Sequence, residues 1–216
     1  EFMKSAIALA EKGRGFTNPN PLVGAVIVKN GKIIAEGWHH KLGSLHAERD
    51  ALKNAAEKNV DVRGASIYVT LEPCCHTGRQ PPCTQAIIES GISEVIYGSS
   101  DPNPLVNGKG KKILEAAGIK VAAGFLKEEC DKLNPVFFHY IKNKMPYVIL
   151  KYAMTADGQT ATSKAESRWI TGQLARKNVH QTRANVMAVL TGIGTAKKDN
   201  PMLNVRLDDG LEHRQP

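Results

Sequence analysis

Long apolar runs are missing from this 216-residue sequence, and so is a secretory start. No stretch approaches the roughly 18 consecutive apolar residues that a membrane-spanning helix needs. The first residues, Glu1-Phe2-Met3-Lys4, lack the pattern of positive charge, apolar stretch and small-residue cleavage site that directs secretion. We therefore expect a chain that has no membrane partner and resides in the cytoplasm.

Aromatic residues are few, at 6%, and the 21 acidic residues are outnumbered by 29 lysines and arginines, which gives a formal net charge of +8. Such a balance favours anionic partners, either phosphorylated metabolites or nucleic acid. The basic residues are scattered, and the densest cluster is only Lys109, Lys111 and Lys112. Because the sequence shows no aromatic-interleaved basic patch, we interpret the charge as a solvated face and expect no nucleic-acid partner.

Cysteine is also scarce, with four residues in the chain, but Cys74, Cys75 and Cys83 fall close together. In a chain without an export signal, such clustering indicates a metal or catalytic site rather than disulfides. The fourth, Cys130, is expected to be a buried helix residue.

Apolar periodicity predicts alternating helices and strands before residue 143. The helices are expected at 3–12, 46–58, 83–90, 111–117 and 127–142, the last disturbed at Pro135, and the strands at 22–28, 32–35, 66–71, 94–98 and 119–122. Asn30-Gly31 between the first two strands is the strongest short hairpin signal. This order is typical of an α/β fold with a mostly parallel sheet, in which ligands collect at the carboxyl ends of the strands.

A different pattern begins after a linker at 143–146. Strands are expected at 147–153, 159–162 and 186–191, and a helix at 171–182. About 70 residues with three strands make a poor independent core. We therefore expect a complete domain over 1–143 and an incomplete α/β unit over 144–216.

Three metal-ligating residues stand where predicted elements begin or end. His46 opens a helix, Cys74 follows the strand at 66–71, and Cys83 opens the next helix. A catalytic zinc site keeps three such protein ligands and leaves the fourth place to water, whose pKa the metal lowers to about 7. Glu48, two residues after His46, can move a proton from that water to a leaving amine. The pattern is that of the zinc-dependent deaminases.

Plainer interpretations of these residues stay open at this point. A lone histidine–x–glutamate is common, and Cys74 and Cys83 could be core thiols. They could also belong to a structural zinc site that Cys75 or His76 completes, because structural sites usually have four protein ligands. Cys75 could replace Cys74, although Cys74 is favoured because it directly follows Pro73. Taken together at one strand end and two helix starts, the residues favour catalysis.

Several segments resemble the bifunctional deaminase/reductase family of riboflavin biosynthesis: Asn18–Ala25, His46–Glu48, Tyr68–Cys74, Pro81–Cys83 and Asp101–Pro104. Eight residues separate Cys74 from Cys83, whereas cytidine and tRNA-adenosine deaminases typically have two there. The resemblance implies a cytidine-deaminase-like three-layer αβα domain with a zinc ion. Its reaction would be the hydrolytic deamination of 2,5-diamino-6-ribosylamino-4(3H)-pyrimidinone 5′-phosphate, with release of ammonia.

The family's substrate-side positions fall on Asn20, His39, Arg79, Asp101 and Asn103. The Arg79 guanidinium offers a fork for phosphate, and Asp101 and Asn103 suit sugar hydroxyls. The alternatives are a surface charge for Arg79 and an ordinary turn for Asp101–Pro104.

Further segments resemble the start of the family's reductase domain, which is dihydrofolate-reductase-like and uses NADPH: Lys151–Gly158, Ser167–Ile170, Thr191–Thr195 and Asp199–Arg206. The resemblance implies NADP contacts at Ala153, Trp169, Thr195 and Asp199, and substrate contacts at Ser167, Arg183, Leu203 and Arg206. The family's reductase continues past the last residue here, so we expect this segment to be inactive alone. Because the family commonly assembles, a homo-oligomer is also expected.

Overall fold

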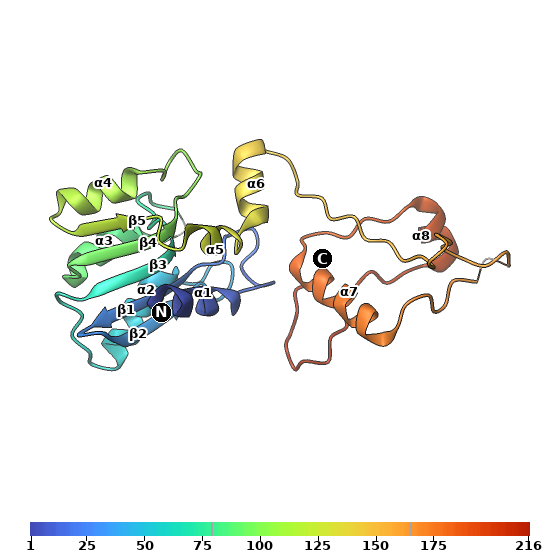
Figure 1. Ribbon diagram of the computed structural model, residues 1–216, viewed down its shortest axis with the longest axis horizontal. Helices are drawn as coiled ribbons and strands as arrows, with labels where there is room; N and C mark the ends of the chain where they lie inside the picture. Colours follow the sequence, from blue (N-terminus) through green and yellow to red (C-terminus); the bar gives the residue numbers. More distant parts are fainter. Residues whose placement is uncertain (79, 165) are drawn as a thin grey trace. The chain divides into compact units, whose positions relative to one another are not determined.

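The computed structural model describes residues 1–78, 80–164 and 166–216 (Figure 1). Its contacts divide the chain into two compact units, Glu1–Tyr147 and Val148–Pro216. Within the described residues, no helix has both the length and the apolar character needed to cross a membrane.

A five-stranded sheet forms the centre of the first unit, in the order β2-β1-β3-β4-β5 (Figure 1). The strands are β1 (Gly24–Lys29), β2 (Lys32–Trp38), β3 (Ser66–Leu71), β4 (Glu94–Ser99) and β5 (Lys120–Ala123). β1 runs antiparallel to β2 and β3, whereas β3, β4 and β5 are parallel. Asn30 and Gly31 make the predicted hairpin turn with φ values of 52° and 70°, as a type I′ turn requires.

Helices cover both faces of this sheet, which confirms the predicted αβα arrangement. On one face, α2 (Ala47–Glu57), α3 (Cys83–Ser90) and α4 (Lys109–Ala116) share a buried cluster with β1, β3 and β4. On the other face, α1 (Phe2–Glu11) and α5 (Lys127–Asp131) pack around Met3, Val26 and Cys130. The close approach of α1 depends on Gly24, because a Cβ there would lie 2.0 Å from the carbonyl oxygen of Ala6.

The carboxyl ends of the parallel strands bring distant segments to one edge. Leu71 at the end of β3 pairs with Ser99 at the end of β4, so the segments after both strands leave the sheet side by side. The first of these segments carries Cys74, and the second carries Asp101. The sheet topology therefore gathers the predicted site residues of both segments at one edge.

The helix predicted over 127–142 is broken in two. α5 ends at Asp131, and α6 (Pro135–Asn143) begins after Asn134, whose φ of −128° and ψ of 42° are not helical. Pro135 occupies the first helical position, where its missing N–H costs no hydrogen bond and where its ring prevents a continuous helix from forming. The predicted disturbance at Pro135 is thus a sharp corner.

The second unit contains α7 (Gln173–Asn185), which overlaps the predicted helix at 171–182, and α8 (Ile193–Asp199), which was not predicted. The strands predicted at 147–153, 159–162 and 186–191 are wrong: among the described residues no strand follows β5. A strand exists only where a neighbouring strand completes its hydrogen-bond ladder, and these segments have no such neighbour. High β-propensity alone therefore did not produce a sheet.

Candidate metal and substrate site

Three metal-donor atoms converge at the carboxyl edge of the sheet: His46 Nδ1, Cys74 Sγ and Cys83 Sγ all lie within 4.8 Å of one another. The Nδ1 atom is 3.5 Å from each sulfur. With Zn–S bonds of about 2.3 Å and Zn–N bonds of about 2.05 Å, tetrahedral geometry separates nitrogen and sulfur ligands by about 3.6 Å. The donor set and its spacing therefore fit one zinc ion.

The local fold explains why these donors meet. His46 is the N-cap of α2 with extended backbone angles, so its side chain turns away from the helix. Cys83 is the first residue of α3, and its backbone N–H donates to Cys74 Sγ at 3.4 Å. This helix start favours the thiolate form of Cys74, because the free N–H group of Cys83 and the helix dipole stabilise negative charge on the Cys74 sulfur.

Protonation of the three donors is strongly coupled. A hydrogen bond from Cys83, reinforced by His46, lowers the pKa of Cys74 to about 4. The Cys83 thiol is the donor in that bond and is buried, so its own pKa is raised. The hydrogen bond to Cys74 raises the pKa of His46. A metal ion would displace the protons that these groups share in its absence.

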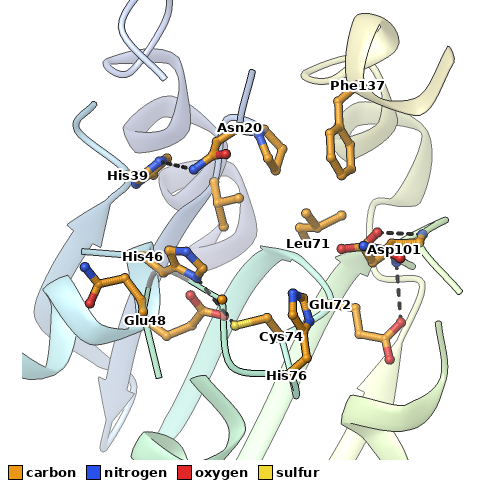
Figure 2. Close-up of a pocket in the computed structure, with 15 residues that line it drawn as sticks. Asn20, His39, His46, Glu48, Leu71, Glu72, Cys74, His76, Asp101 and Phe137 are labelled. Atoms are coloured by element: carbon orange, nitrogen blue, oxygen red, sulfur yellow. Dashed lines mark hydrogen bonds between the residues drawn. The ribbon is translucent and has the colours of Figure 1, made fainter. Parts of the chain in front are cut away.

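Glu48 lies in the first turn of α2 and is only 3% exposed. Figure 2 shows its carboxyl group beside His46 and Cys74. Burial raises the pKa of Glu48, and the negative charge of Cys74 raises it further. A carboxyl group with a raised pKa can both accept and return a proton near neutral pH, which is the property of a general acid–base residue.

A cavity of about 320 Å³ opens over these residues (Figure 2). This volume suits a small-molecule ligand. Residues from several loops, from the end of β3 and from α2 and α6 line it: Asn20, Pro21, Val23, His39, His46, Glu48, Leu71, Glu72, Cys74, His76, Gly78, Gln80, Asp101, Asn103 and Phe137.

Four of the five predicted substrate residues, Asn20, His39, Asp101 and Asn103, line this cavity. The His39 Nδ1 atom lies 2.9 Å from the Leu45 carbonyl oxygen and therefore carries the proton. Its Nε2 atom then accepts from the Asn20 amide at 3.1 Å. Burial lowers the pKa of His39, in keeping with a neutral ring. The remaining predicted residue, Arg79, lies outside the described residues.

Asp101 and Asn103 are held by an acidic residue that the sequence analysis missed. Glu72 is 3% exposed, and its Oε2 atom accepts from the backbone N–H groups of Asp101 (3.4 Å) and Gly108 (3.2 Å). Asp101 in turn accepts from the Asn103 N–H at 2.8 Å. Burial, with the charge of Glu72 adding to it, raises the pKa of Asp101 to about 6. A glutamate directly after a buried strand was the signal for this role.

Phe137 on α6 also lines the cavity and was likewise missed. The sequence analysis placed it within the helix predicted at 127–142 and assigned it no role. The alternative ligands are placed differently: the Cys75 sulfur lies 3.5 Å from the Leu105 carbonyl oxygen, and His76 lies on the cavity wall. Among the described residues, the donor group at the metal position consists of three side chains, which leaves a fourth position open.

In the second unit, some of the predicted reductase residues come together. Arg183 donates to the Asn204 carbonyl at 3.1 Å, and Arg206 donates to the Asn204 side chain. Burial and the charge of Arg206 lower the pKa of Arg183. The Trp169 ring is 70% exposed and lies under the Arg176 guanidinium. The other predicted positions are spread over the unit: Thr195 and Asp199 on α8, and Ala153, Ser167 and Leu203 outside helices.

An αβα sheet that gathers one histidine, two cysteines and a buried glutamate at the ends of its strands has the arrangement of the zinc-dependent deaminases. Residues 1–99 match the family model of the cytidine and deoxycytidylate deaminase zinc-binding region. Residues 146–216 match the model of the RibD C-terminal domain.

Individual relatives narrow this class. The chain is 59% identical over 212 residues to the riboflavin biosynthesis protein RibD of Actinobacillus pleuropneumoniae, a match that covers 98% of this chain and 56% of that protein. The crystal structure of a diaminohydroxyphosphoribosylaminopyrimidine deaminase/5-amino-6-(5-phosphoribosylamino)uracil reductase from Thermotoga maritima gives a TM-score of 0.92 at 52% identity, covering 100% of this chain and 60% of that one. The Rib2 deaminase of Aspergillus oryzae, solved in complex with DARIPP, gives 0.53 at 26% identity, covering 65% and 92%.

Nearly the whole chain is thus similar to RibD proteins. It spans less than two thirds of the length of the curated relatives that it matches.

Proposed function

We propose that residues 1–143 form a zinc-dependent deaminase domain of riboflavin biosynthesis. Its substrate would be 2,5-diamino-6-ribosylamino-4(3H)-pyrimidinone 5′-phosphate. The observation that carries this proposal is the group of three donors, His46, Cys74 and Cys83, with buried Glu48 beside them in a cavity of ligand size. The RibD relatives and the Rib2 deaminase solved with DARIPP support the choice of substrate.

His46, Cys74 and Cys83 would hold the zinc ion, which when bound lowers the pKa of a coordinated water and so supplies a nucleophile at neutral pH. Glu48 accepts a proton from the attacking water and passes it to the leaving amino group. In the balanced reaction, the water oxygen bonds to the ring carbon and the C–N bond breaks. Nitrogen leaves as ammonia with the proton that Glu48 delivers.

The remaining polar residues of the cavity would bind the rest of the substrate. Asn20, oriented by neutral His39, offers an amide to the pyrimidine ring. Asp101 and Asn103, held by Glu72, would bind sugar hydroxyls. Arg79 would bind the phosphate through its guanidinium fork.

We further propose that residues 144–216 belong to an NADPH-dependent reductase domain. The match to the RibD C-terminal domain supports this, as does the juxtaposition of Arg183 and Arg206, which suits an anionic ligand. The proposed NADP contacts are Ala153, Trp169, Thr195 and Asp199, and the proposed substrate contacts are Ser167, Arg183, Leu203 and Arg206. Because the described residues of this unit include no strand, we expect these 216 residues to show no reductase activity by themselves.

We also propose a cytoplasmic homo-oligomer without a nucleic-acid partner. The four cysteines are free thiols, in keeping with a reducing compartment. Large apolar side chains remain exposed in the second unit, among them Leu174 (85%) and Leu190 (98%), which a second copy of the chain would cover. Light scattering coupled to size exclusion measures this assembly.

The decisive experiment is ammonia release from the phosphorylated pyrimidine by the zinc-loaded chain. NADPH oxidation is measured in parallel with the deaminated product as substrate. We expect ammonia release and no NADPH oxidation. Absence of ammonia from zinc-loaded protein, or deamination of tRNA at physiological salt instead, would contradict the proposed substrate.

A further inference from the structure

The corner between α5 and α6 is hydrogen-bonded to the loop before β1, which lies far from it in the sequence. Asn134 is 5% exposed, and its Oδ1 atom accepts from the Leu22 N–H at 2.7 Å. Its Nδ2 atom donates to the Leu22 carbonyl at 2.8 Å. One side-chain amide thus satisfies both backbone polar groups of a buried residue 112 positions away. Both hydrogen bonds are lost if this side chain is removed.

The residues beside Asn134 fix the corner in place. Leu133 is 4% exposed and packs in a small apolar cluster with Ala10 and Leu22. Pro135 starts α6, and its fixed φ sets the direction in which the helix leaves the corner. The position of α6 is therefore defined against Leu22.

Both partners of this connection stand next to the cavity. On one side, Asn20, Pro21 and Val23 flank Leu22 and line the cavity. On the other side, Phe137 follows Asn134 by three residues on α6. Figure 2 shows the Phe137 ring extending from α6 toward the cavity above Leu71, with Asn20 on the adjoining wall. The bonds to Asn134 thus hold these two walls together.

The Phe137 ring differs from its surroundings. Most of the lining side chains are polar or ionisable, and Phe137 is the only phenyl ring among those that the structure describes. An aromatic ring presents an apolar surface that heteroaromatic rings contact favourably in stacked or edge-to-face geometry. It also lies outside residues 1–99, which match the general deaminase zinc-binding model.

We propose that Phe137 contacts the substrate in the deaminase cavity and that Asn134 is the positioning residue that holds this ring at its distance from Asn20. The proposal rests on the proposed deaminase function and deepens it, because it assigns part of the substrate selection to the α5–α6 corner. The ligand class is a heteroaromatic ring whose face or edge meets the phenyl group.

The test compares Phe137→Ala and Asn134→Ala with the wild-type chain, using steady-state ammonia release from the phosphorylated pyrimidine. Phe137→Ala should raise KM about tenfold, equivalent to about 1.4 kcal/mol of lost contact, with kcat within about twofold and zinc content unchanged. Tyr140→Ala is the matched control, since it removes an aromatic ring from the same helix that is 52% exposed and does not line the cavity. Its KM should equal that of the wild type.

A double-mutant cycle separates positioning from general structural damage. If Asn134 acts through the Phe137 ring, the Asn134→Ala/Phe137→Ala protein should have a KM no higher than the worse single variant. Additive effects on KM would overturn the positioning role. Asn134→Asp is the second variant, because the aspartate keeps the acceptor for the Leu22 N–H and replaces the donor to the Leu22 carbonyl with an oxygen that repels it.

The outcomes distinguish this proposal from the proposed function. If the wild-type chain is active and Phe137→Ala leaves its KM unchanged, the proposed contact between Phe137 and the substrate is wrong, whereas the proposed deaminase function stands. A zinc-loaded wild-type chain that releases no ammonia would overturn the proposed function and, with it, the ligand assigned to this wall.

Discussion

Replacement of Glu48 by glutamine removes the proposed proton carrier while changing little else. Glutamine has the size of glutamate, so the 3% exposed position stays filled and no cavity forms. None of the three donor atoms at the metal position belongs to Glu48. The variant should therefore fold and hold zinc as the wild type does.

The expected loss of turnover is large. General acid–base catalysis contributes about 10²–10⁴-fold to a rate. Figure 2 places the other carboxylates of the cavity, Glu72 and Asp101, across from His46, where they cannot take over the transfer. We therefore expect the upper part of this range, a loss in kcat of about 10³–10⁴-fold, or about 4–5.5 kcal/mol in activation free energy.

The assay is single-turnover and steady-state ammonia release, with zinc content measured on the same samples. Glu57→Gln is the control, because Glu57 lies on the same helix, is 65% exposed at its side chain and pairs with exposed Lys53. It should behave as the wild type. A Glu48→Gln protein that keeps zinc and turns over within about tenfold of the wild type would refute the proton-carrier role.

Two other substitutions probe the site. Cys74→Ser removes one of the three metal donors, so this variant should lose zinc to a chelator at least about tenfold faster than the wild type. Cys75→Ser should keep its zinc, because the Cys75 sulfur faces the Leu105 carbonyl; equal zinc retention in the two variants would contradict the ligand assignment. Asp101→Asn tests burial of charge. The pKa of Asp101 is raised from 3.8 to about 6. The carboxyl group is therefore neutral at low pH, and above pH 6 its ionisation lowers the free energy of unfolding by about 3 kcal/mol. Asp101→Asn should unfold at a higher temperature than the wild type near pH 8 and at about the same temperature near pH 4. The same difference in unfolding temperature at both pH values would contradict the raised pKa.

Local signals predicted most of the first unit. The strand at 66–71 and the helix at 83–90 agree with β3 and α3 to the residue, because apolar runs there are bounded by clear stops such as Gly91 in the left-handed conformation. The metal donors were also visible, since their residue types and the ends of their elements are local properties. Their 3.5 Å spacing was not, because it depends on how α2 and α3 pack on the sheet.

What the sequence could not provide were roles that depend on distant partners. Glu72 matters because its carboxylate meets the backbone of Asp101 and Gly108, and Asn134 matters because it meets Leu22. No local sequence pattern predicts such long-range hydrogen-bonded pairs. The strands predicted after residue 146 failed for the same reason, since a sheet requires partners that propensity does not specify.

Because Asn134 lies late in the first unit, its hydrogen bonds to Leu22 form only after most of that unit has been synthesised. The last metal donor, Cys83, leaves the ribosome about 50 residues before Asn134, a delay of about 3–10 s at typical elongation rates of about 5–20 residues per second. During that interval the nascent chain contains all three donor residues, whereas the wall that carries Phe137 has not been synthesised. All three metal donors therefore precede the α5–α6 corner in the order of synthesis, and among the described lining residues Phe137 is the last to be made.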